Sequence, residues 1–147
     1  MTDSFSTLLQ DLGKVFQLNL VPDKYNACSL EIPPLTIQLE LDSDLENLLI
    51  FTKIIELPPG KFRENVLAEA LKANGLPDPR PGVFGYFAAT NHLTLHQSYP
   101  LKILNGDNLA GLFGSFFELG SSWHESIHRG QPSPMGSASP PPFGIRL

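Results

Sequence analysis

The chain has 147 residues and a formal net charge of −5 at pH 7, with 41% hydrophobic and 17% charged side chains. That length suits one domain, which would bury roughly 70% of the surface that its unfolded chain exposes. No cluster of Lys and Arg occurs, and phosphate binding needs a basic surface, so the composition argues against nucleic acid as a partner.

The sequence predicts a soluble protein of the cytoplasm. Its one cysteine, Cys28, cannot form an internal disulfide and suits a reducing compartment. Residues 1–4 lack the basic region and the following apolar stretch of a secretory signal. No run approaches the about 18 apolar residues that a membrane-spanning helix needs, so we expect no span.

Apolar side chains recur at helical spacing near the start of the chain and predict an amphipathic helix that ends before Pro22. This stripe consists of Phe5, Leu8, Leu9, Leu12, Val15 and Phe16. Three strands are expected next, over residues 28–32, 35–41 and 48–57. A meander of three antiparallel strands is the simplest arrangement for them.

The third of these strands is apolar on both faces, because side chains alternate across a strand. One face carries Leu49, Phe51, Ile55 and Leu57, and the other carries Leu48, Ile50 and Ile54. Both faces of such a strand need cover, and the rest of the chain offers only three amphipathic helices. We therefore expect some apolar surface to await another polypeptide, which favours binding over catalysis.

A second helix is predicted from Phe62 to Leu71, and Asn74 and Gly75 form a typical helix ending. Two further strands are expected over residues 83–89 and 92–99. They are joined by a short connection at Thr90 and Asn91 that suits a hairpin.

Asp107 can cap a third helix, whose glycines weaken it and would permit a break near Gly120. Its apolar stripe consists of Leu109, Leu112, Phe113, Phe116, Phe117, Trp123 and Ile127. The sequence thus predicts an α+β fold over residues 1–130, in the order helix, three strands, helix, two strands, helix, with helices covering an antiparallel sheet. Residues 131–147 are rich in Pro, Gly and Ser and are predicted to form a flexible tail.

One catalytic motif occurs. His124, Glu125 and His128 fit H-E-x-x-H, in which two histidines bind zinc and the glutamate acts as base. No Glu, Asp, His or Cys follows His128 to supply a third ligand. We interpret the motif as solvated polar residues at a helix C-terminus and expect no catalytic residue, no metal and no cofactor.

Several segments resemble those of class I chaperones of type III secretion, the CesT/SycE-like family. They are residues 26–32, residues 57–64, residues 70–75, the pair Gly85-Tyr86 and the ending 140–147. The element order also resembles that of the family, whose members are small, acidic, cytosolic and dimeric.

The resemblance implies a non-enzymatic chaperone of the bacterial cytoplasm that binds the N-terminal segment of a secreted effector in extended form and keeps it competent for secretion. By analogy, the effector-binding residues would be Phe5, Leu8, Leu9, Leu12, Ile37, Leu39 and Ile50. By the same analogy, the dimer interface would contain Phe62, Val66, Leu67, Ala70, Val83 and Phe84. A homodimer is the default, a heterodimer with a related chaperone is the alternative, and the secretion ATPase is a further partner in the family.

Two other functions stay open from the residues alone. An α+β domain of this kind can enclose a pocket for a small apolar ligand. A zinc hydrolase that uses His124, Glu125 and His128 is the enzymatic alternative.

Overall fold

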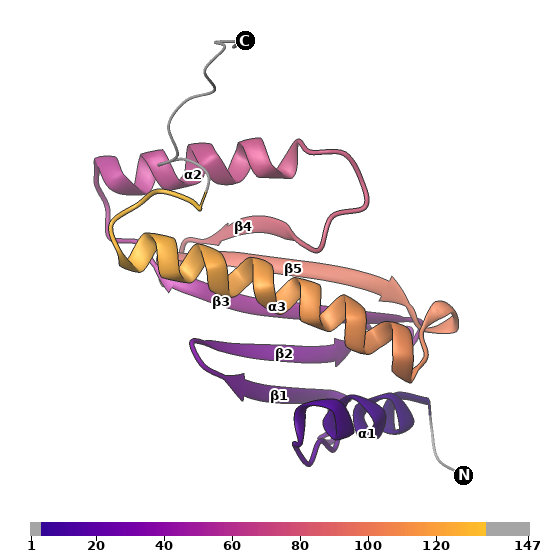
Figure 1. Cartoon of the computed structure of the whole chain (residues 1–147). Helices are drawn as coiled ribbons and strands as arrows, with labels where there is room; N and C mark the ends of the chain where they lie inside the picture. Colours follow the sequence, from indigo (N-terminus) through magenta and orange to yellow (C-terminus); the bar gives the residue numbers. More distant parts are fainter. Residues whose placement is uncertain (1–3, 135–147) are drawn as a thin grey trace.

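A computed structural model describes residues 4–134 and confirms the predicted order of elements (Figure 1). The elements are α1 (Ser4–Phe16), β1 (Ala27–Ile32), β2 (Leu35–Leu41), β3 (Asn47–Glu56), α2 (Lys61–Asn74), β4 (Val83–Phe87), β5 (His92–Pro100), the short 3-10 helix η1 (Leu101–Ile103) and α3 (Gly106–His128). The predicted α+β class with an antiparallel sheet is confirmed.

The five strands form one sheet in the order β1-β2-β3-β5-β4, and every neighbouring pair is antiparallel. The register brings one buried residue from each strand into a row across the sheet. This row consists of Leu30, Ile37, Thr52, Leu95 and Phe84. Its one polar member, Thr52, donates its hydroxyl to the carbonyl of Thr36 at 2.8 Å, so the group is not left unpaired in the core.

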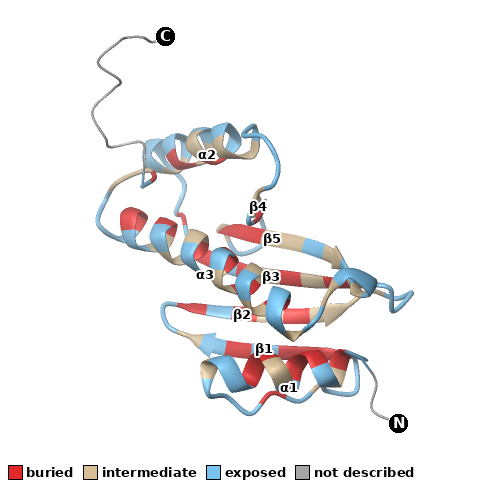
Figure 2. Ribbon diagram, turned by 45° about the vertical axis from the view of Figure 1, so that its right-hand side comes forward, coloured by how far each residue is buried: buried red, intermediate tan, exposed pale blue. Residues whose placement is uncertain are grey.

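Helices α1 and α3 pack on the face of the sheet that carries this row, and buried residues gather there in Figure 2. Phe16 of α1 meets Phe113 of α3 edge to face, with ring centroids 5.1 Å apart. Helix α2 lies beside β4 at one end of the sheet.

The start and the continuity of α3 differ from the prediction. Asn105, not Asp107, is the cap: its side chain accepts from the N–H of Asn108, whose own side chain accepts from the N–H of Asn105. The helix also runs through Gly120 without a break. A Cβ at Gly120 would lie 2.9 Å from Cδ1 of Leu35, so this glycine lets α3 approach the sheet closely.

The opposite face of β2 and β3 has no helix over it among the described residues. Its side chains are half-buried or exposed, and on β3 they include Leu49, Phe51 and Lys53. Buried positions alternate along β3 as far as Ile54, across the irregular register between Lys53 and Ile55. Leu57, expected beside Leu49 and Phe51, lies past the end of β3 and is buried.

The chain turns back after α3 and passes beneath α2 (Figure 1). Gln131 donates its N–H to the carbonyl of Ser126 at 2.8 Å, and the fully buried Ser133 donates its hydroxyl to the carboxylate of Glu69 at 3.3 Å. The first four residues of the predicted tail therefore lie against the domain. The rest of it, residues 135–147, lies outside the described residues.

Candidate protein-binding surfaces

The residues expected to contact an effector lie in the hydrophobic core. Each is at most 6% exposed: Phe5, Leu8, Leu9, Leu12, Ile37, Leu39 and Ile50. The four residues of this set that lie on α1 face α3 and the core, and the sheet residues lie on the face that α1 and α3 cover. As placed, these side chains have no surface to offer a peptide, so the assignment needs correction.

Exposed apolar side chains instead occur at the end of α1, where Val15 of the predicted stripe is exposed, and in the loop to β1. We call them the N-terminal apolar surface: Val15 (58% exposed), Leu18 (37%), Val21 (64%) and Tyr25 (71%). They precede β1, an edge strand whose one neighbour among the described strands is β2. Three of the four lie in irregular structure, where no periodicity could have identified them in the sequence.

The loop that carries this surface is held in place by its own hydrogen bonds. Leu18 donates its N–H to the carbonyl of Gly13 at 2.9 Å, and a Cβ at Gly13 would collide with the carbonyl oxygen of Leu18. Further along, the carboxylate of Asp23 accepts from the N–H of Tyr25 at 2.7 Å and from that of Ala27 at 3.0 Å. The apolar side chains are thus presented on a fixed backbone.

The residues expected at the dimer interface divide into two groups. Val66, Ala70 and Phe84 are at most 6% exposed, and the Phe84 ring packs 4.3 Å from the indole of Trp123, so these three belong to the core of one protomer. Phe62, Leu67 and Val83 keep exposed or half-exposed surface.

An apolar groove of about 190 Å³ runs between α2 and β4, and we call it the α2–β4 groove. It is lined by Leu67, Ala70, Leu71 and Asn74 of α2, by Phe84, Gly85 and Tyr86 of β4, and by Leu93. Leu71 is 71% exposed at its rim. Leu71 was not among the residues expected at the dimer interface, and its exposure adds it to the candidates.

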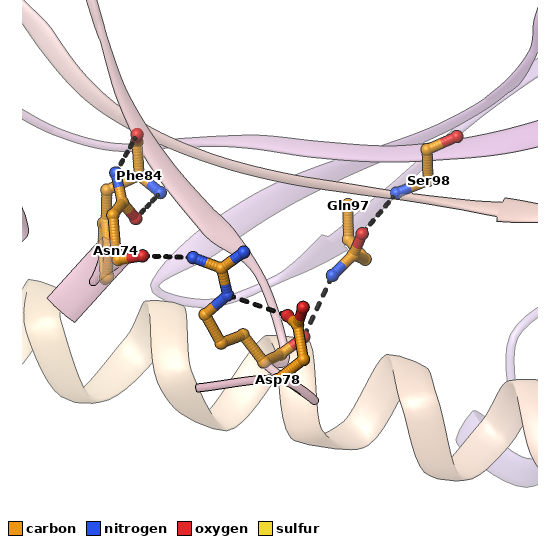
Figure 3. A network of polar contacts seen from close by, with 6 residues as sticks. Asn74, Asp78, Phe84, Gln97 and Ser98 are labelled. Atoms are coloured by element: carbon orange, nitrogen blue, oxygen red, sulfur yellow. Dashed lines mark hydrogen bonds and ion pairs between the residues drawn. The ribbon is translucent and has the colours of Figure 1, made fainter. Parts of the chain in front are cut away.

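The outer edge of β4 is partly closed by α2 (Figure 3). The Asn74 side chain donates to the carbonyl of Phe84 at 2.9 Å and accepts from the N–H of Phe84 at 2.8 Å. Arg80 donates to the carbonyl of Asn74 and, through Nε, to the carboxylate of Asp78 at 3.1 Å. Because backbone groups alternate in direction along a strand, the N–H and carbonyl of Tyr86 face the same outer edge.

A polar cluster marks the other end of the groove. Arg63 donates through Nη1 to the hydroxyl of Tyr86 at 2.7 Å and to Oδ1 of Asn91 at 3.2 Å. The Tyr86 hydroxyl in turn donates to Oδ1 of Asn91 at 2.7 Å. No carboxylate of residues 4–134 pairs with Arg63, whose guanidinium lies over the Tyr86 ring at 5.5 Å from its centroid.

The H-E-x-x-H residues lie on the last turns of α3. The rings of His124 and His128 stack with centroids 5.9 Å apart. Within residues 4–134, no group of three or more His, Cys, Asp or Glu is arranged to hold a metal ion. Nδ1 of His124 is buried and has no hydrogen-bond partner in this part of the chain.

Comparison with known proteins identifies relatives of this chain. The model of the Tir chaperone protein (CesT) family matches residues 7–124, whereas no curated protein matches the sequence. The chain is similar in structure to one in a HopA1–SchA chaperone–effector complex, with 22% identity, 85% of this chain and 99% of that chain covered, and a TM-score of 0.65.

Two further structures are similar. A chain of an ExoT–SpcS complex from Pseudomonas aeruginosa has 19% identity, 80% of this chain and 95% of that chain covered, and a TM-score of 0.60. A chain of the Yersinia pestis type III secretion chaperone SycH in complex with a fragment of YscM2 has 15% identity, coverages of 79% and 96%, and a TM-score of 0.64. No helix among the described residues is long and apolar enough to span a membrane.

Proposed function

Because this chain belongs to the Tir chaperone protein (CesT) family, we propose that it is a type III secretion chaperone of the bacterial cytoplasm. It binds the N-terminal region of a secreted effector in extended form and keeps that region competent for secretion. The structures similar to it include a complex described as one of chaperone and effector, which supports this proposal.

The observation that carries the proposal is the N-terminal apolar surface beside an edge strand. Val15, Val21 and Tyr25 are each more than half exposed, and they precede β1 at one end of the sheet. An extended peptide can pair its backbone with an edge strand while its side chains contact neighbouring apolar residues. This mode suits a client that has no fold of its own, because the backbone hydrogen bonds do not depend on the client's sequence.

The α2–β4 groove lies at the opposite end of the sheet and is the proposed subunit contact. Its apolar lining and the exposed Phe62 and Leu71 give a second copy of the chain a surface to cover. A homodimer would place two N-terminal apolar surfaces at its outer ends, so one effector segment could contact both. A heterodimer with a related chaperone would use the same groove.

Catalysis has no part in this function. The effector needs to be held and released without any covalent change, and the paired histidines of α3 lie outside both surfaces. Delivery to the secretion ATPase would then be a matter of binding between proteins.

Co-purification tests the proposal. The tagged chain is isolated from its native cytoplasm, and we expect a secreted protein to accompany it, with the N-terminal region of that protein protected from limited proteolysis. The double variant Val21→Asp, Tyr25→Asp should reduce this capture at least tenfold without loss of secondary structure, because it adds charge to the apolar surface.

Leu45→Asp is the matched control, since Leu45 is 54% exposed in the turn between β2 and β3. It should capture the effector as the parent chain does. If no secreted protein accompanies the chain, the function is wrong. Equal capture by the double variant and the parent would instead leave the function standing and refute the assigned surface.

A further inference from the structure

A hollow of about 430 Å³ lies between the loop before β4, strand β5 and helix α3. Its apolar lining comes from Pro79 and Pro81 of the loop, the ring of Tyr99 on β5 and Leu112 on α3, with Ser115 one turn further along α3. Neither the N-terminal apolar surface nor the α2–β4 groove includes these residues, so the proposed function leaves the hollow unexplained.

The hollow is preformed, because the loop is fastened to the sheet and to α2 (Figure 3). Gln97 of β5 donates through Nε2 to the carbonyl of Arg80 at 2.9 Å, and the Arg80 guanidinium contacts the carbonyl of Asn74. A ligand would therefore meet a fixed wall of two prolines rather than a loop that it must first order.

Tyr99 gives the hollow a hydrogen-bond donor. Its hydroxyl has no partner among residues 4–134, and burial raises the pKa of the phenol, so the proton stays in place near neutral pH. Grooves lined by aromatic rings that also offer a donor recognise proline-rich segments in the polyproline II form, since the carbonyls of that form have no internal partners.

The chain itself contains a proline-rich sequence. Residues 140–142 are three consecutive prolines, and Phe143, Ile145 and Leu147 follow at alternating positions. The carboxylate of Asp78 at the rim of the hollow already pairs with the guanidinium of Arg80, which also lines it, so charge does not contribute to the match. The segment complements the hollow through its apolar residues and its run of prolines.

The end of the described chain starts close to the hollow. Ser133 is held against Glu69 in the middle of α2, and Asn74, which Arg80 contacts, lies only about 8 Å further along that helix. Residues 135–139, which would connect the described chain to this segment, could span about 17 Å when extended. This reach exceeds the about 8 Å from Glu69 to Asn74, so the start of the segment can lie beside the loop.

We propose that residues 140–147 dock in this hollow of their own chain, with the proline run against Tyr99, Pro79 and Pro81, and Phe143 over Leu112. The tail then covers an apolar surface of the domain. It becomes a ligand of this chain, and any partner that binds the tail must compete with the hollow for it.

Disulfide trapping in the full chain tests the proposal. In a Cys28→Ser background, one protein carries Ser115→Cys with Gly144→Cys, and its matched control carries Ser122→Cys with Gly144→Cys. Ser122 is exposed two turns further along α3, on the same face and nearer to the point where the described chain ends. A free tail would reach residue 122 at least as often, whereas a docked tail favours residue 115.

We expect the intramolecular disulfide to form at least tenfold faster with residue 115 than with residue 122 in a glutathione buffer, as followed by intact mass. Adding Phe143→Ser should abolish most of this preference. Equal rates, or a preference that survives Phe143→Ser, would overturn the proposal. A dimer-sized product as the main species would also overturn it, because the tail would then occupy the hollow of a second copy.

Discussion

The side-chain amide of Asn74 takes the place of a neighbouring strand at Phe84. Its Nδ2 donates to the Phe84 carbonyl at 2.9 Å, and its Oδ1 accepts from the Phe84 N–H at 2.8 Å. One residue thereby ties the end of α2 to β4 and satisfies both backbone groups of Phe84, whose ring packs on Trp123.

Asn74→Ala should lower the free energy of unfolding by about 1–3 kcal/mol, because both backbone groups of Phe84 would lose their partner in a half-buried site. Urea denaturation measures the loss. Asn19→Ala removes an exposed asparagine amide and should change stability by less than about 0.5 kcal/mol. Equal effects of the two substitutions would contradict the role given to Asn74.

Substitution of two glycines of α3, Gly114 and Gly120, should change the stability of the domain in opposite directions. A Cβ at Gly114 would meet nothing within 4 Å, so Gly114→Ala should stabilise the helix by about 0.5–1 kcal/mol. At Gly120 the added methyl groups of Gly120→Val would press on the buried Leu35, and we expect a loss of about 1–3 kcal/mol. Thermal unfolding of both variants tests the pair, and a stabilised Gly120→Val would refute the close approach.

Local periodicity was sufficient to predict the elements of this fold. Alternation in residues 35–41 identifies β2 without knowledge of its neighbours, and the apolar spacing of α1 identifies that helix. The cap of α3 was placed wrongly at Asp107, since Asn105 and Asn108 form a reciprocal pair that Asp107 does not join. Short-range patterns thus locate an element more reliably than its first residue.

Which apolar stripe faces a partner could not be predicted, because burial depends on contacts between distant parts of the chain. Leu8 and Leu12 are buried because α1 meets α3, about a hundred residues later in the sequence. Val21 and Tyr25 were not predicted because they lie in a loop. A loop has no regular spacing of side chains from which an exposed side could be told from a buried one. The separation of core from surface needed the packed structure.

Substitutions one turn apart on α1 should distinguish a residue of the core from a residue of the exposed surface. Leu12 is fully buried and Val15 is 58% exposed. Leu12→Asp places a charge in the core without a partner and should unfold the domain, since its cost of several kcal/mol approaches the whole stability of a small protein. Val15→Asp should keep the native circular dichroism spectrum and thermal midpoint. Two folded variants would show that the core assignment of α1 is wrong.

The α2–β4 groove should control self-association. Leu71→Glu places a charge at the apolar rim of the groove, where burial against a second copy would remove it from water. We expect at least a tenfold weaker dimer by light scattering across a concentration series, with unchanged secondary structure. Leu45→Glu, in the turn between β2 and β3 where the side chain is 54% exposed, should leave the dimer intact. A dimer of unchanged strength in Leu71→Glu would place the subunit contact elsewhere.

The turn between β2 and β3 should make stability depend on pH through Asp42. Its carboxylate accepts from the side chain of Asn47 at 2.7 Å and from the N–H groups of Glu46 and Asn47 at 3.0 and 3.2 Å. These bonds, the Asn47 side chain first, lower the pKa of Asp42 below its ordinary value of 3.8. The unfolded chain therefore takes up this proton before the folded chain does as the pH falls.

The stabilisation from Asp42 is thus complete above the unfolded pKa of 3.8 and is lost as the pH falls through 3.8 towards the lower folded value. Asp42→Asn should have a lower thermal midpoint than the parent at pH 6, and the difference should narrow by pH 3. Asp44→Asn in the same turn is the control, because it also removes one negative charge. A difference between parent and Asp42→Asn that stays constant from pH 6 to pH 3 would show that the carboxylate does not hold the turn.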